Sequence, residues 1–115
     1  MEKTKIFVAT GMSQGAHVCF LKLALEEERC RKSMENPSNI EIMMPGTIRL
    51  DEIEVEGTKE EVMNNGRIFI AYKEDRVHNS GLLACKLFLN RKEAREYASA
   101  NQMALTDYMV MWMSM

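Results

Sequence analysis

The sequence lacks the features by which several large classes of protein are recognised. It has 15 basic and 17 acidic residues and a net charge of -2, so there is no positive excess with which to bind nucleic acid. No apolar run approaches the length needed to cross a bilayer, and residues 6–9 are too short a run for the core of a signal peptide. These absences predict a cytoplasmic protein that binds neither membranes nor nucleic acid.

Cysteine is also scarce, and its spacing argues against two kinds of site. Cys19, Cys30 and Cys85 are an odd number without a close pair, which favours free thiols in a reducing compartment over a disulfide framework. Together with His17 and His78, they show no spacing typical of a zinc site. No glycine-rich phosphate-binding motif is present. We therefore predict no metal and no cofactor.

What the sequence does contain is typical of one globular domain. Its 115 residues can bury a substantial core but are too few for two domains. Hydrophobic residues make up 46% and charged residues 28%, and both fractions are ordinary for globular proteins. The 11 methionines are a high count for this length, and we expect most of them to fill the core.

The clearest local pattern lies in the second half of the chain. Residues 67–74 are rich in β-forming side chains and follow a turn signal, and residues 82–89 form a second apolar run after a polar loop. Asn90 and Glu93 then have the spacing of a helix N-cap and its partner in the first turn. This pattern predicts two strands followed by a helix over residues 91–102.

The N-terminal part of the chain contains a weaker copy of this pattern. Residues 5–9 resemble residues 67–71, and residues 22–25 resemble residues 86–89. In each copy, an arginine follows the lysine of the second match by nine positions. Such self-similarity indicates one supersecondary unit used twice.

The remaining segments are assigned from their apolar patterns. Residues 17–25 fit either a strand or a helix, and the polar residues after them favour a strand followed by a short helix. A capping pair at Thr58 and Glu61 predicts another short helix that ends near Gly66. We further expect strands over residues 3–10, 39–44, 47–56 and 108–115.

These elements predict an α+β fold. Its sheet would be mainly antiparallel, with two or three short helices packed on one face, and it would be built from a duplicated ββα(β) unit. The chain would form a single domain over residues 1–115, with half-repeats over residues 1–45 and 64–115.

One short motif suggests catalysis. Residues 11–16, Gly-Met-Ser-Gln-Gly-Ala, resemble the G-x-S-x-G elbow of carboxylesterase-type α/β-hydrolases. The resemblance implies Ser13 as nucleophile, with Asp51 and His78 following in that family's chain order. However, only one strand precedes the serine, and no loop precedes that strand to form an oxyanion hole. We therefore interpret the segment as a glycine-rich turn and keep a minimal serine hydrolase as the alternative function.

An acidic run over residues 51–61 is the first candidate binding surface. As a strand, it would turn Ile53 and Val55 towards the core and Glu52, Glu54 and Glu56 towards solvent. Such a face can meet a basic partner surface.

The methionine-rich C-terminal segment is the second candidate. As a strand, residues 108–115 would be apolar on both faces. The strand would then lie either in the centre of the sheet or against a partner chain, including a second copy in a homodimer. Its candidate contact residues are Met109, Met111, Trp112 and Met113.

Residues 87–98 resemble small uncharacterised proteins of phages and other mobile elements, in which a strand ends near a phenylalanine and a helix follows. Phe88, Glu93, Ala94, Tyr97 and Ala98 carry the resemblance, and it implies no catalytic residue. The small size, the lack of a credible catalytic set, the acidic run and the apolar C-terminal segment predict a non-enzymatic protein-interaction module, of the kind that inhibits host defence machinery as anti-CRISPR proteins do. Its partner would be another protein.

Overall fold

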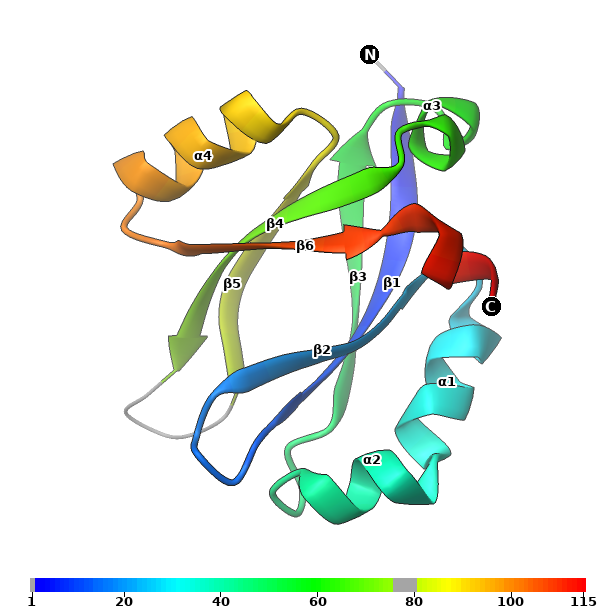
Figure 1. Ribbon diagram of the computed structural model, residues 1–115, viewed down its shortest axis with the longest axis vertical. Coiled ribbons are helices and arrows are strands. Elements are labelled where there is room, and N and C mark those ends of the chain that lie inside the picture. Colours follow the sequence, from blue (N-terminus) through cyan, green and yellow to red (C-terminus); the bar gives the residue numbers. More distant parts are fainter. Residues whose placement is uncertain (1, 76–80) are drawn as a thin grey trace.

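The computed structural model describes residues 2–75 and 81–115, which form two small antiparallel sheets with helices around them (Figure 1). The first sheet has the order β2-β1-β3, with β1 (Lys3–Met12), β2 (Val18–Ala24) and β3 (Arg49–Glu56). The second has the order β5-β4-β6, with β4 (Arg67–Asp75), β5 (Gly81–Phe88) and β6 (Ala104–Met109). The helices are α1 (Glu27–Glu35), α2 (Pro37–Ile42), α3 (Lys59–Asn64), α4 (Arg91–Ala100) and a 3-10 helix, η1 (Val110–Ser114). The predicted α+β class is confirmed.

The two sheets have the same topology, because in each one the first strand along the chain is central and the next two flank it. The hairpin register matches as well. Val8 lies opposite Leu23 in the first sheet, and Ile70 lies opposite Leu87 in the second. These are residues that the internal similarity aligns. The duplicated ββα(β) unit is therefore visible in the strand order, and its first copy includes β3 and reaches Glu56.

Each of the two longer helices covers the outer face of its own sheet. Helix α1 packs against β1 and β2, and α4 packs mainly against β4, on the opposite side of the molecule (Figure 1). Cys30 of α1 and Ala94 of α4 occupy equivalent positions in the repeat, and both are fully buried. The helices thus lie on two sides rather than on the one face expected from the sequence, because each folds back on the hairpin that precedes it.

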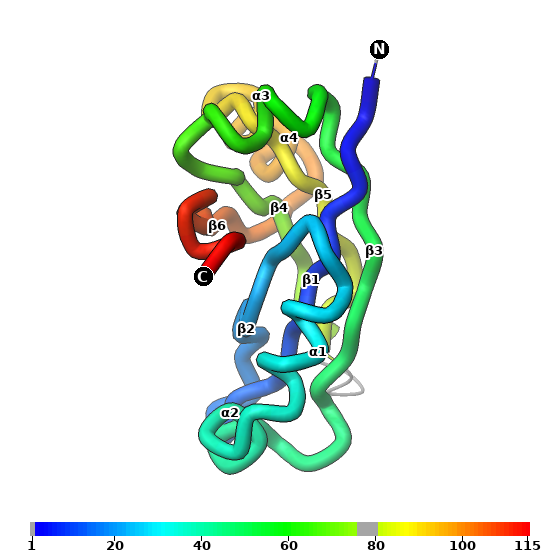
Figure 2. Tube along the Cα trace, turned by 90° about the vertical axis from the view of Figure 1, so that its right-hand side faces the viewer, coloured from blue at the N-terminus to red at the C-terminus, as the bar shows by residue number. Residues whose placement is uncertain are grey.

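The inner faces of the two sheets share one hydrophobic core. Ile6 and Val8 of β1 and Ile68 and Ile70 of β4 belong to it, and none of the four has any exposed surface. At one edge of the molecule, β3 runs beside β5 (Figure 2). Because both central strands supply the same core, each unit covers apolar surface that the other would otherwise expose to water.

Two predicted helix starts are confirmed by their capping hydrogen bonds. The Thr58 hydroxyl accepts the Glu61 N–H at 3.1 Å, and the Glu61 carboxylate accepts the Thr58 N–H at 3.0 Å. At α4, the Asn90 side chain accepts the Glu93 N–H at 3.0 Å. These bonds satisfy backbone donors that have no partner within a helix.

The strand expected over residues 39–44 is wrong, since residues 37–42 form α2. The Asn36 side chain accepts the Ser38 N–H at 2.9 Å, and Pro37 occupies the first turn, where its missing N–H costs nothing. The Asn-Pro pair therefore both ends α1 and starts α2.

The strand expected over residues 108–115 is also wrong. Strand β6 ends at Met109, and the following residues form η1. A 3-10 helix has three residues per turn, so it places Val110 and Met113 on the same side, and both are buried in the core. Methionine alternates with other apolar residues in this segment, which suggested a strand. The buried residues, Val110 and Met113, are instead three positions apart, as in a 3-10 helix.

Candidate functional site

Large apolar side chains are exposed where α3 meets η1. We call the exposed large apolar residues of these two contacting elements and of the residue after η1 the C-terminal patch; they are Met63 of α3 together with Met111, Trp112 and Met115. The exposed fractions are 37%, 60%, 44% and 76%, respectively. The Trp112 ring stands edge-on to the ring of Tyr108, with centroids 5.4 Å apart. Aromatic and methionine side chains are enriched in protein interfaces, so the patch has the composition of a contact surface.

The backbone beneath the patch is anchored to the core. Val110 and Met113 pack among the central residues of the two sheets, and the Val110 N–H donates to the Gly66 carbonyl oxygen at 2.9 Å. Trp112 lies between these two anchors in the chain. Its main chain therefore has anchored neighbours on both sides, although 44% of the residue is exposed.

A buried lysine holds the far end of η1. The Lys22 ammonium donates hydrogen bonds to the carbonyl oxygens of Trp112 and Met115, the second at 3.0 Å. Arg29 reaches the same Met115 oxygen at 3.4 Å. Only 9% of Lys22 is exposed, and burial, followed by repulsion from Arg29, lowers the pKa of its ammonium below the ordinary value. Carbonyl groups at the end of a helix carry partial negative charge, which suits a cation placed there.

The equivalent lysine of the second unit does something different. Lys86 is exposed, and its ammonium lies 4.6 Å from the ring centroid of Tyr97 and 5.3 Å from that of Phe88. Among the described residues, the contact between a lysine and the carbonyl oxygens at the end of η1 therefore belongs to the first unit. This contact stabilises the backbone of the C-terminal patch, and it is not part of the structure that the two units share.

The structure separates the four C-terminal residues that the sequence put forward together. Met111 and Trp112 lie on the surface, Met109 is half-buried at the end of β6, and Met113 is only 2% exposed and belongs to the core. A strand would have placed Met109, Met111 and Met113 on one face, whereas η1 rotates Met113 inwards. Met63 and Lys22 were missed because they lie far from η1 in the sequence.

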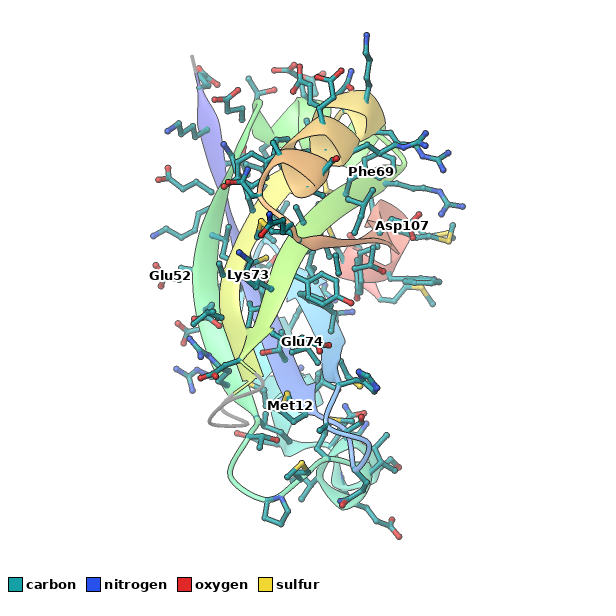
Figure 3. All side chains as sticks on the ribbon, turned by 90° about the vertical axis from the view of Figure 1, so that its left-hand side faces the viewer. Met12, Glu52, Phe69, Lys73, Glu74 and Asp107 are labelled. Carbon is teal, nitrogen blue, oxygen red and sulfur yellow. The ribbon has the colours of Figure 1, made fainter. Side chains whose placement is uncertain are left out.

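The acidic residues of β3 face solvent, but basic residues lie across from two of them. Glu52, Glu54 and Glu56 are all exposed, and Figure 3 shows Glu52 at the outer side of the sheet, pointing away from the molecule. Lys5 lies opposite Glu54 in the register, and its ammonium is 3.5 Å from the Glu52 carboxylate. Lys3 likewise lies opposite Glu56. Cross-strand pairs of this kind partly neutralise the face.

Ser13 lies in a hairpin turn between two antiparallel strands. Its N–H donates to the His17 carbonyl oxygen at 2.8 Å, and its hydroxyl accepts the His17 N–H at 3.3 Å. A hydrolase elbow instead joins a strand to a helix, which exposes the serine above the sheet. The ring of His17 lies near a carboxylate that the sequence did not suggest, with Nδ1 3.8 Å from the nearer oxygen of Glu74.

The two proposed companions of Ser13 are not placed beside it. Asp51 pairs with Val8 in the middle of β1, roughly 16 Å back along the strand from Ser13, and its carboxylate accepts a bond from Arg49 at 2.8 Å. His78 lies outside the residues that the structure describes. The structure therefore does not bring Ser13 and Asp51 together.

Two of the three thiols are held in their neutral form. Burial raises the pKa of Cys30 to about 11 and that of Cys85 to about 12, so both are protonated at neutral pH. Over residues 2–75 and 81–115, no three His, Cys, Asp or Glu side chains are grouped so as to hold a metal ion. Within the same ranges, no helix is long and apolar enough to cross a membrane.

The chain matches no known family model, and neither the curated proteins nor the solved structures compared with it include a match.

Proposed function

We propose that this chain is a non-enzymatic protein-binding module whose C-terminal patch is the contact surface. The observation that supports the proposal is an indole left 44% exposed on a backbone that the core and Lys22 hold in place. Exposing a tryptophan to water forgoes the free energy of burying it, and binding a partner would recover that loss.

The anchoring of η1 favours a binding role for the exposed Trp112 side chain over an exposure without function. Association costs free energy when side chains and loops must be ordered, and a preorganised anchor avoids part of that cost. Tryptophan is also among the residues that most often dominate binding energy. Met63, Met111 and Met115 add flexible side chains to the patch, and such side chains can adapt to the shape of a partner.

The resemblance of residues 87–98 to small phage proteins favours one form of this proposal, an inhibitor of host defence machinery. In that form, the partner is a component of a defence system, and the patch blocks it by occupying its surface. A homodimer through the same patch is the other form.

The test is to replace Trp112 with the photocrosslinking residue benzoylphenylalanine in cells that make the protein. We expect irradiation to give one dominant adduct, because a specific contact holds one partner at this position. Mass spectrometry of the adduct then decides between a defence component, another protein and a second copy of the chain.

Leu83 is the matched control, since it is a large apolar residue on β5 that is 62% exposed. The same substitution there should give no dominant adduct. The proposal fails if irradiation produces no adduct from position 112, or the same mixture from both positions. The inhibitor form alone fails if the dominant partner is not part of a defence system.

A further inference from the structure

A second surface lies on the other side of α3 from the C-terminal patch. A cavity of about 580 Å³ opens where the end of β3, the start of α3 and the turn from β5 to α4 meet. This volume is within the range of pockets that bind ligands or anchoring side chains. Gly57 helps to shape it, because its φ is +133° and a Cβ there would come within 2.8 Å of the Leu89 side chain.

The walls of the cavity combine negative charge with apolar surface. Glu2, Glu56, Glu61 and Glu93 line it from four different segments, and Lys86 is the one basic residue among the lining residues. Phe88 and Leu89 supply apolar surface. A small inorganic cation prefers oxygen ligands alone, whereas a guanidinium or alkylammonium group also gains from apolar and aromatic surface.

The Phe88 ring that lines the cavity already contacts an alkylammonium group of this chain. The Lys86 ammonium lies 5.3 Å from the centroid of the Phe88 ring, within the range of a cation–π contact. Arginine stacks on aromatic rings and pairs with carboxylates through a planar fork, so it suits such a wall better than lysine does.

We propose that this cavity receives an arginine side chain from a basic segment of the protein partner. The inference rests on the proposed function, since it names the chemistry of the partner. Helix α3 links the two surfaces, because Glu61 lines the cavity and Met63 belongs to the C-terminal patch. One partner can therefore contact both surfaces across α3.

The experiment titrates the isotope-labelled full chain with the peptide acetyl-Gly-Arg-Gly-Arg-Gly-amide, followed by NMR. We expect saturable shifts of the Gly57, Thr58 and Asn90 amides, and none with a peptide that has glutamine in place of arginine. The double substitution Glu56→Gln/Glu93→Gln should weaken binding about tenfold, because it removes two of the four carboxylates. Glu2→Gln/Glu56→Gln should act in the same direction and leaves α4 untouched.

Glu35→Gln/Glu41→Gln is the matched control, since it removes the same charge from exposed residues of α1 and α2. It should leave the affinity within about twofold of the unchanged chain. An equal loss of affinity in this control, or shifts that do not saturate, would overturn the proposal in favour of unspecific charge attraction. The same shifts with spermidine would overturn it in favour of a polyamine ligand. Trp112→Ser should leave peptide binding intact, so a failure of this inference is distinguishable from a failure of the crosslink at position 112.

Discussion

Replacing Ile68 with alanine is expected to lower the free energy of unfolding by about 3 kcal/mol, and replacing Ile6 should lower it by nearly the same amount. Both side chains have no exposed surface and belong to the core that the two sheets share. They also occupy equivalent positions in the repeat. Truncating either one leaves a cavity between tightly packed sheets, where neighbouring side chains have little room to relax.

Urea denaturation followed by circular dichroism measures both values. Ile40→Ala is the control, because Ile40 is 53% exposed on α2 and its truncation should change stability by less than about 0.5 kcal/mol. Each variant should unfold in one transition, since a shared core makes the two units cooperative. Two separate transitions, or a loss confined to one of the two isoleucines, would contradict the shared core.

The second large effect is expected at Lys22. Substitution Lys22→Met keeps an unbranched side chain that is one atom shorter, and it removes the ammonium that binds the Trp112 and Met115 carbonyl oxygens. We expect a loss of about 2 kcal/mol, because two acceptors at the end of η1 lose a charged donor, while the cost of burying a charge is relieved.

Lys86→Met provides a control at the equivalent position of the second unit. Lys86 is exposed and contacts only aromatic faces among the interactions described above, so its loss should cost less than about 1 kcal/mol. Thermal and urea denaturation of the two variants side by side make the comparison. Equal losses would mean that the ammonium of Lys22 does not stabilise η1.

The repeat was predictable because the internal similarity falls on the central strands and their hairpin partners, whose inward side chains form the core. In each unit, the central strand and its hairpin partner supply buried side chains to the same core, so the same apolar residue types recur. The caps at Thr58 and Asn90 were predictable for a related reason, since each satisfies backbone donors within three positions along the chain.

Features that depend on distant contacts could not be predicted in this way. The buried lysine that supports η1 is ninety positions before Trp112, and nothing near either residue signals the contact. Met113 was a candidate contact residue because an alternating pattern suggested a strand that lies either in the centre of the sheet or against a partner. In the structure, a 3-10 helix buries Val110 and Met113 at a spacing of three. The carboxylates of the cavity likewise come from four separate segments.

The proposed binding function depends most directly on a C-terminal patch that is both exposed and held in place. Trp112 is the only tryptophan in the chain, so its time-resolved fluorescence anisotropy reports on this residue alone. We predict that the indole of the unchanged chain tumbles with the whole molecule, and that Lys22→Met adds a fast local component. A dominant fast component in the unchanged chain would show that the patch is mobile and would contradict its role as a preorganised binding surface.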